Sequence, residues 1–195
     1  MILTDKRIRE LAESSELITP FAEENLQSES YDVTIGKEIT IMKKEIRCLD
    51  ISRQDDIDGI YQHIDISEKG YTISPKEYLL VSLGENLKLP NNLTAHLRPK
   101  TRYIRLGLIV SGQHCNSTYT GHLRIGLFNA TDYPIRIHSG YTIAQFVFEE
   151  LECVPSSEKL YENKENAHYQ NENGGFRGAN FDDSYLDALW DKILA

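Results

Sequence analysis

Hydrophobic and polar positions divide the chain into a short helical start, a long middle section of alternating residues and a polar tail. Near the N-terminus, Ile8 belongs to a helical stripe that Thr4 can cap. Leu3 precedes this cap and can pack on Ile8 as a hydrophobic staple. We expect the helix to end near Ser14 or Ser15.

The middle section, from residue 31 to residue 148, has short runs in which apolar and polar side chains alternate, separated by Gly, Pro and Asn. Alternation with a period of two is typical of strands that bury one face. Examples are Tyr31-Val33-Ile35, Tyr78-Leu80-Ser82 and Leu123-Ile125-Leu127. With the first helix, this section predicts a mostly β domain over residues 1–155, a sandwich or a distorted jelly-roll-like barrel.

Apolar residues become sparse after Pro155, which predicts a flexible lid or loop over residues 156–183. Beyond it, Ser184 can cap an amphipathic C-terminal helix over residues 184–195 that carries Trp190. This helix could pack on its own domain or trimer, or on a dedicated partner.

Charge, apolar runs and cysteines argue against two classes of function, nucleic-acid binding and a membrane role. A formal net charge of -9 argues against sequence-independent binding to nucleic acid, which depends on Lys and Arg. No apolar run approaches the roughly 20 residues of a membrane-spanning helix. Three cysteines without CxxC spacing, and a start without a signal-peptide pattern, lead us to expect a reduced, cytoplasmic protein with no membrane role.

A cationic segment over residues 97–107 is the main candidate for ligand chemistry. It carries Arg98, Lys100, Arg102 and Arg105, with the hydroxyl of Thr101 between them. Guanidinium groups and a hydroxyl can hold phosphate oxygens through charge-assisted hydrogen bonds, and a lysine adds a point charge. The segment therefore suits a triphosphate, although a solvated cationic edge would have the same composition.

Several motifs follow one another in a fixed order along the chain. They are Ile18-Thr19-Pro20-Phe21, Ser30 to Gly36, Pro75, Glu77, Glu85, Leu89-Pro90, Arg105-Leu106-Gly107-Leu108, Tyr119-Thr120-Gly121-His122, Leu127-Phe128-Asn129, Gly140 to Phe146 and Glu165 to Gly174. In this order they resemble the dCTP deaminases and their relatives, the trimeric dUTPases. The resemblance covers nearly the whole chain and is closest to the deaminase branch.

The resemblance implies a dUTPase-type fold and a homotrimer whose sites, between subunits, bind dCTP, dUTP or a related deoxypyrimidine nucleotide. It implies Mg²⁺ that enters on the triphosphate, and no zinc, in agreement with the absence of zinc-motif spacing among Cys and His. The matching nucleotide-binding positions are Lys100, Thr101, Arg102, Arg105, Asn116, Tyr119, Gln145, Tyr161, His168 and Asn173.

Two positions depart from the family's chemistry. Gly126 stands where the deaminases have a Glu, and Asn116 stands where the dUTPases have an Asp that holds the attacking water. His168 replaces a lysine of the lid. General acid or base help contributes about 10²- to 10⁴-fold in rate, so binding could persist without turnover.

Other residues near the expected site could take over proton transfer. His114 is adjacent to the expected water position and can exchange protons near neutral pH. His122 is expected to point away from its neighbours Leu123 and Ile125. Cys115 is a weaker candidate, as a nucleophile, because only His114 could lower the pKa of its thiol. Each histidine is more simply explained as a surface or hydrogen-bonded imidazole.

We therefore predict a dCTP deaminase-like enzyme with possible dUTP diphosphatase activity. The first alternative is a nucleotide-binding or regulatory homologue that has lost catalysis, because Gly126 and Asn116 replace the expected acids. A plain interaction module that uses the Trp190 helix is the third hypothesis, and it leaves the cationic segment unexplained.

Overall fold

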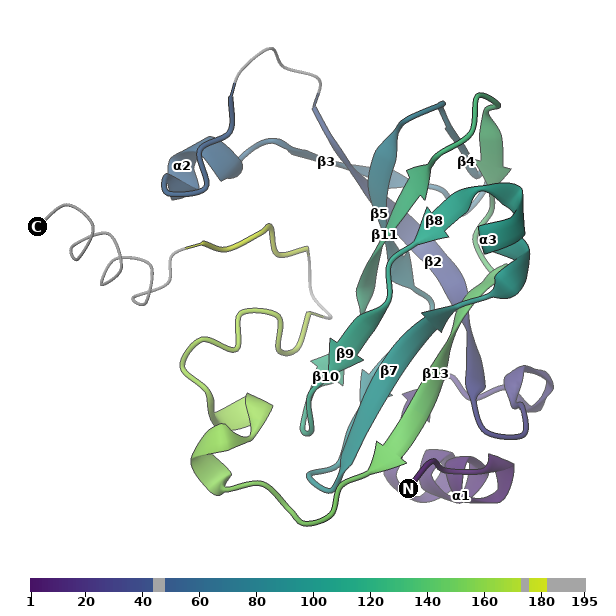
Figure 1. Cartoon of the computed structure of the whole chain (residues 1–195), viewed down its shortest axis with the longest axis vertical. Helices are drawn as coiled ribbons and strands as arrows, with labels where there is room; N and C mark the ends of the chain where they lie inside the picture. Colours follow the sequence, from purple (N-terminus) through teal and green to yellow (C-terminus); the bar gives the residue numbers. More distant parts are fainter. Residues whose placement is uncertain (44–47, 173–175, 182–195) are drawn as a thin grey trace, which may run out of the picture.

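The computed structural model describes residues 1–43, 48–172 and 176–181, so Asn173 and the expected helix over 184–195 lie outside the described residues. Strands dominate the described chain, as the alternating pattern predicts (Figure 1). The helices are α1 (Asp5–Ser15), α2 (Gln54–Ile57) and α3 (Thr101–Leu106), with 3₁₀ turns η1 (Glu23–Asn25), η2 (Ser157–Lys159) and η3 (Tyr161–Asn163). The strands are β1 (Ile18–Thr19), β2 (Tyr31–Met42), β3 (Tyr61–Asp65), β4 (Tyr71–Ile73), β5 (Tyr78–Leu83), β6 (Asn86–Lys88), β7 (Leu93–Pro99), β8 (Leu108–Val110), β9 (Gln113–Cys115), β10 (Thr120–Gly121), β11 (Arg124–Asn129), β12 (Ile135–Ile137) and β13 (Thr142–Glu150).

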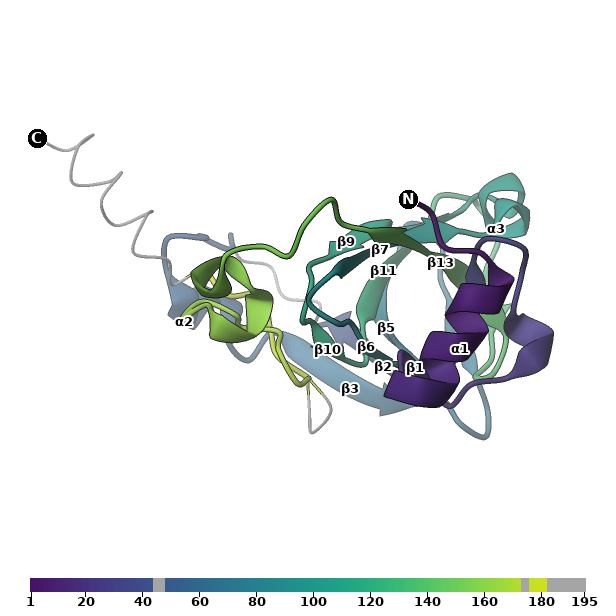
Figure 2. The same cartoon turned by 90° about the horizontal axis from the view of Figure 1, so that it is seen from below.

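An eight-stranded antiparallel sheet forms the body of the domain, in the order β8-β11-β5-β2-β13-β7-β9, with β3 also paired to β2. The long strand β2 serves both halves: its beginning pairs with β13, and its later part pairs with β5 and β3. The register with β5 shifts between Ile35 and Ile39. Seen from below, the strands curl around a common interior (Figure 2), which confirms the predicted barrel-like β fold.

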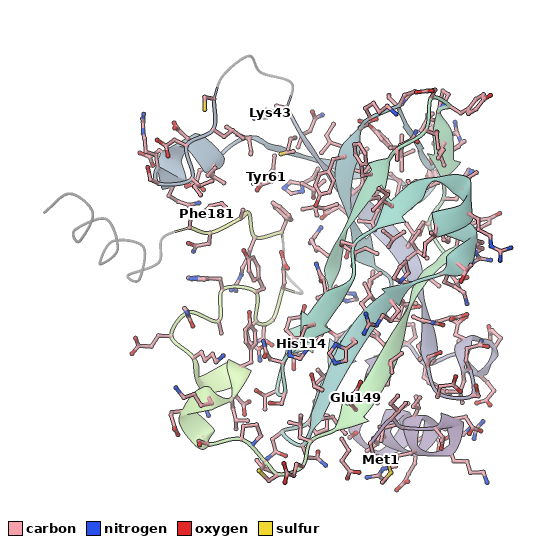
Figure 3. All side chains as sticks on the ribbon, in the orientation of Figure 1. Met1, Lys43, Tyr61, His114, Glu149 and Phe181 are labelled. Atoms are coloured by element: carbon pink, nitrogen blue, oxygen red, sulfur yellow. The ribbon has the colours of Figure 1, made fainter. Side chains whose placement is uncertain are left out.

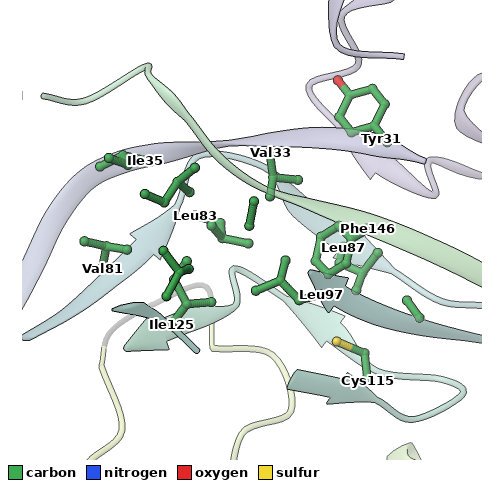
Figure 4. Close-up of a cluster of buried hydrophobic side chains, with 14 of the residues drawn as sticks. Tyr31, Val33, Ile35, Val81, Leu83, Leu87, Leu97, Cys115, Ile125 and Phe146 are labelled. Atoms are coloured by element: carbon green, nitrogen blue, oxygen red, sulfur yellow. The ribbon is translucent and has the colours of Figure 1, made fainter. Parts of the chain in front are cut away.

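Aliphatic and aromatic side chains from both halves of the sheet fill this interior (Figure 4). Tyr31-Val33-Ile35 is buried as a set, and so are Ile125 and Leu127 of β11. On β5 the buried side chains are Leu79, Val81 and Leu83. The run Tyr78-Leu80-Ser82 therefore faces away from the core, because alternate residues of a strand point to opposite faces.

The first helix, α1, begins and ends where the sequence predicts. Leu3 and Ile8 are both buried in the core, as a hydrophobic staple requires. Thr4 occupies the N-cap position, but the expected side-chain cap is wrong, because its hydroxyl makes no capping hydrogen bond. The backbone carbonyl of Thr4 instead accepts a hydrogen bond from the amide of Arg7 at 3.0 Å.

Two segments leave the barrel on the same side in Figure 1: the connection from β2 to β3, which carries α2, and the tail that follows β13. The tail, residues 151–172 and 176–181, contains η2 and η3. None of the helices in the described part of the chain has the length and apolar character that crossing a membrane requires.

Candidate functional site

A pocket with a volume of about 750 Å³ lies between the sheet and the tail. Side chains from β2, β3, β5, β9 and β11 line it on the sheet side, and tail residues within 161–172 and 176–179 contribute the other side. In Figure 3 the labelled side chains Tyr61 and His114 mark its upper and lower parts. The volume is within the range of about 300–1,000 Å³ that is usual for small-molecule sites.

Arg124 and Glu172 approach each other inside the pocket. Arg124 of β11 donates a hydrogen bond through Nη1 to Oε1 of Glu38 at 2.6 Å, and its guanidinium carbon lies 5.2 Å from the ring centre of Phe176. Its Nε is 3.6 Å from Oε1 of Glu172, too far for a hydrogen bond. This Nε is buried and has no hydrogen-bond partner among the described residues. Arg124 is therefore held in place with one buried donor available to a ligand.

Glu172 brings a buried carboxyl group into the pocket from the tail. Its side chain is 5% exposed, and Oε1 accepts a hydrogen bond from the backbone amide of Arg177 at 2.6 Å. Burial raises the pKa of this carboxyl, and the amide and Arg124 lower it by less. Among the described residues that line the pocket, Glu172 is the only acidic one. It can carry a proton closer to neutral pH than an ordinary glutamate.

Tyr119, expected to contact the nucleotide, also faces this space. It is 5% exposed, and its buried hydroxyl has no hydrogen-bond partner within the described chain. Burial raises the pKa of the Tyr119 phenol, so the hydroxyl stays neutral. Its ring centre is 5.9 Å from that of Tyr161. The pocket therefore brings together two aromatic side chains that the sequence assigned to one site.

His114 and Asn116 line the same pocket, and both are exposed. The His114 ring centre is 5.0 Å from that of His96, whose Nε2 is 3.8 Å from Oε1 of Glu149. Asn116 offers an amide, which can orient a water molecule by hydrogen bonding but cannot take its proton. These two residues form a polar edge of the pocket.

Gly126 lies on β11 beside the pocket, and the ring of Tyr78 covers it. A Cβ atom on Gly126 would be 2.5 Å from the Tyr78 hydroxyl oxygen and 2.8 Å from its ring carbon Cε2. Tyr78 itself lines the pocket. The space into which a glutamate at position 126 would project is therefore occupied by a neutral phenol.

Cys115 borders the pocket but does not have the properties of a nucleophile. Its side chain is 3% exposed, and burial raises the pKa of its thiol to about 12. A thiol with this pKa is almost entirely protonated at neutral pH, whereas nucleophilic attack requires the thiolate. His122 lies outside the pocket, with Nδ1 3.2 Å from the carbonyl oxygen of Leu83.

The end of the described tail is attached to α2 and β3. The Gln54 amide donates to the carbonyl of Ala179 at 3.1 Å and accepts from the amide of Phe181 at 2.9 Å. The amide of Ala179 donates to the Tyr61 hydroxyl at 3.1 Å. Phe176 packs edge-on against Tyr61, with ring centres 4.8 Å apart. These contacts hold the tail across the pocket.

A second glutamine attaches the tail to the sheet at the other end. Gln170 accepts a hydrogen bond from the amide of Thr120 at 3.1 Å and donates one to the carbonyl of Thr118 at 2.8 Å. His168, an expected nucleotide contact, does not line the pocket. Its Nδ1 is 3.1 Å from the side-chain nitrogen Nδ2 of Asn180.

The cationic segment lies elsewhere in the described chain. Residues 100–106 do not line the pocket, and Figure 1 shows α3 and the tail on opposite sides of the barrel. Lys100 forms an ion pair with Asp32 of β2, and Asp32 is 6% exposed. Arg102 donates to the carbonyl of Thr142 at 2.6 Å. Arg105 is exposed on α3, as is Thr101.

Gln145 belongs to this second group as well. The pairing of β13 with β2 sets Gln145 opposite Asp32, and the Gln145 side chain accepts a hydrogen bond from the Ser30 hydroxyl at 3.3 Å. Apart from His168, the expected nucleotide contacts in the described chain therefore form two groups. Asn116, Tyr119 and Tyr161 line the pocket, and the others lie on α3, at its N-cap Lys100 or on β13.

Comparison with known proteins accounts for the order of the motifs. Residues 2–151 match the family model described as dCTP deaminase-like, which is more than half of the 195-residue chain. The chain belongs to the dCTP deaminase-like family.

Relatives within this family share about a third of their residues with the chain. It is 33% identical over 154 residues to the "dCTP deaminase, dUMP-forming" of Persephonella marina, covering 78% of this chain and 85% of the relative. Identity to the protein of the same name from Nanoarchaeum equitans is 32%, with 87% and 93% covered. Identity to the dCTP deaminase of Pyrococcus horikoshii is 30%, with 80% and 86% covered.

The fold is also similar to a crystal structure of 2'-deoxycytidine 5'-triphosphate deaminase from Agrobacterium tumefaciens. The TM-score is 0.62 at 22% identity, and the match covers 76% of this chain and 48% of that one. This dCTP deaminase-like chain thus spans about half the length of the solved protein. The likeness shows the β fold.

In this dCTP deaminase-like chain, the sequence did not mark Glu172, Arg124 or Tyr78 as residues of the pocket. Glu172 belongs to the run Glu165 to Gly174 that resembles the family, but the polar composition around it indicates only a loop. The cover of Gly126 by Tyr78 depends on the register between β5 and β11, which sets Gly126 opposite Leu80. A strand alignment of these two runs could have placed Tyr78 near Gly126.

Proposed function

We propose that this chain deaminates a deoxycytidine nucleotide by hydrolysis, with dCTP as the substrate, which yields the deoxyuridine nucleotide and ammonia. The observation that carries the proposal is the pocket of a dCTP deaminase-like chain in which a buried carboxyl, an arginine Nε and a phenol hydroxyl meet. The family's named relatives support dCTP as the substrate.

The pocket supplies an apolar area for the faces of a pyrimidine ring and polar atoms for its edge. Leu80, Leu123 and Tyr78 provide apolar and aromatic area, which excludes water and packs on a planar base. The buried Nε of Arg124 and hydroxyl of Tyr119 can pair with polar atoms on the edge of the base. The buried polar atoms would then gain the partners that the protein does not supply.

The phosphates are assigned to the cationic group around α3, with Lys100, Thr101, Arg102 and Arg105 as contacts. This group does not reach the pocket within one chain, so the proposal includes a homotrimer in which another copy provides it. Ile104 and Leu106 of α3 and Ile109 of β8 are 58%, 54% and 55% exposed. Apolar side chains that are exposed together support contact with a second copy.

Mg²⁺ is proposed to enter with the triphosphate, where it would neutralise phosphate oxygens. Among residues 1–43, 48–172 and 176–181, no group of three or more His, Cys, Asp and Glu is arranged to hold a metal ion. A zinc held by the protein is not part of the proposal, because the cysteines lack the spacing of a zinc motif.

Further hydrolysis of the product to dUMP is a second candidate activity. The relatives from Persephonella marina and Nanoarchaeum equitans are named as dUMP-forming, which favours it. Asn116 would orient the attacking water by hydrogen bonding. A cytoplasmic location remains a prediction from the sequence.

The test is incubation of the purified full-length protein with dCTP, dUTP, CTP and UTP in the presence of Mg²⁺. Chromatography follows the products, and thermal shift reports binding. Conversion of dCTP to dUTP or dUMP is expected. Stabilisation by nucleotide without turnover would instead favour a binding or regulatory homologue, in line with Gly126 and Asn116. A protein that shows neither signal would contradict both functions.

A further inference from the structure

Deamination of a pyrimidine needs a group that moves protons between the attacking water, the ring and the departing amine. Gly126 has no side chain, and the amide of Asn116 cannot accept a proton. We propose that Glu172 is the catalytic residue that performs this proton transfer, taking the role of the acid that is missing at Gly126. This inference rests on the proposed deaminase function.

The geometry of Glu172 supports the role. The residue reaches the pocket from the tail, is 5% exposed, and has Oε1 fixed by the amide of Arg177 at 2.6 Å. Arg124 places Nε 3.6 Å from the same oxygen, so the carboxyl stands beside a buried donor that has no partner in the described chain. A catalytic acid or base must be fixed within hydrogen-bond reach of the ligand, and Glu172 is anchored inside the pocket.

The groups that face Glu172 leave it able to hold a proton. Glu38 and Arg124 face it from the sheet, and Arg177 faces it from the tail. The phenols of Tyr119 and Tyr161 also interact with it. Burial has the largest effect and raises the pKa of Glu172. The Arg177 amide and the charges of Arg124 and Arg177 each lower it by less, and the negative charge of Glu38 raises it.

The other titratable candidates are placed less well. His114 is exposed at the edge of the pocket, and its ring is tilted by 46° against that of His96. Cys115 remains a thiol because its pKa is about 12. The Tyr119 phenol has a raised pKa and cannot act as a base at neutral pH. Glu172 is the carboxyl group that the described pocket offers.

Each proton can be followed through the reaction. Protonated Glu172 gives its proton to ring N3, and the resulting carboxylate takes a proton from water as the water oxygen bonds to C4. The restored acid then protonates the amino nitrogen, and the C4–N4 bond breaks with its electron pair leaving on ammonia. The C4 hydroxyl returns its proton to Glu172 and becomes a carbonyl. The sum is cytosine plus water giving uracil plus ammonia, with Glu172 regenerated.

The decisive experiment compares wild-type protein with Glu172→Gln and Glu172→Asp, all full-length, on dCTP with Mg²⁺. Glutamine keeps the size and hydrogen-bonding atoms but cannot transfer the proton, so we expect kcat to fall by about 10²- to 10⁴-fold. Stabilisation by dCTP should persist. Glu158→Gln, which changes an exposed glutamate of the same tail outside the pocket lining, is the matched control and should keep the wild-type kcat.

The pH profile separates proton transfer from mere positioning. Because the cycle starts from protonated Glu172, wild-type kcat should decline as pH rises through the pKa of this residue, and the residual rate of Glu172→Gln should lack that decline. Wild-type kcat in Glu172→Gln would overturn the inference and leave the proposed function standing. If Glu172→Gln does not fold, Glu172→Ala takes its place, and a wild-type kcat with an unchanged alkaline limb in Glu172→Ala would overturn the inference. Absence of turnover in the wild-type protein would reject the proposed function itself.

Discussion

The phenol of Tyr78 lies directly over Gly126, so that a Cβ on the glycine would be 2.5 Å from the hydroxyl oxygen. A side chain of the neighbouring strand β5 therefore fills the space that a side chain at position 126 would need. Placing a carboxylate at this position would require Tyr78 to move.

Gly126→Ala should destabilise the protein by about 1–3 kcal/mol, because the added methyl group overpacks against the Tyr78 ring. Urea denaturation of Gly126→Ala, Tyr78→Ala and the double variant measures the coupling between the two positions. We expect the double variant to be more stable than the sum of the single effects predicts. Simple additivity would show that the two side chains do not compete for space.

Lys100→Met should lower the free energy of unfolding by about 3–5 kcal/mol, because it leaves the carboxylate of Asp32, 6% exposed, without its cation. Adding Asp32→Asn should recover part of the loss, which chemical denaturation can measure. Equal stability of Lys100→Met and the wild type would show that the ion pair contributes nothing to the fold.

Arg105→Ala should leave the fold intact and weaken the binding of a nucleoside triphosphate by about 1.5–3 kcal/mol, the range for hydrogen bonds to charged groups. Arg105 is exposed on α3, so its removal leaves no buried group without a partner. Calorimetric titration is the measurement, with Arg7→Ala on α1 as the control. Equal affinity in the two variants would remove Arg105 from the phosphate site.

Cys48 and Cys153 are exposed and Cys115 is buried, so a thiol reagent at neutral pH should modify two sites in the native protein and three in denaturant. Mass spectrometry of the labelled peptides identifies them. The pKa of Cys115 is raised from 9.0 to about 12 on folding, so its contribution to stability is present below pH 9.0 and is lost as pH rises towards 12. Rapid native labelling of Cys115 would contradict this placement.

Gln54→Ala should release the end of the tail without unfolding the barrel. The variant loses the hydrogen bonds to Ala179 and Phe181, so backbone amides near residue 179 should exchange hydrogen faster while the melting temperature changes little. Gln54→Glu keeps an acceptor for the Phe181 amide and should have an intermediate effect. Unchanged exchange in Gln54→Ala would show that other contacts hold this segment.

The fold could be predicted from the sequence because its main signals are local. Alternation in the runs around Val33 and Ile125 identifies strands, and the spacing of Leu3 and Ile8 places the first helix. The order of the motifs indicated the family that the comparison shows. The side-chain cap at Thr4 failed, because a backbone carbonyl serves the same helix amide.

The site was harder to predict because its contacts join segments far apart in the chain. The approach of Arg124 to Glu172 depends on how the tail folds back across the sheet, and no local pattern encodes this. Similarly, the ion pair of Lys100 and Asp32 ties an expected phosphate contact to the core. Sequence patterns identified residue types that suit a nucleotide, but tertiary packing decided which of them line one pocket.

The long strand β2 has a consequence for how the molecule comes apart. Its first half holds Asp32, which pairs with Lys100 of the cationic segment, and its second half supplies Thr40 and Met42 to the pocket. Because β13 and β5 both pair with this strand, separating either half of the barrel from β2 would expose the other half to solvent. Folding should therefore be cooperative across the barrel, and the slowest-exchanging amides should lie along β2, where the two groups share one piece of backbone.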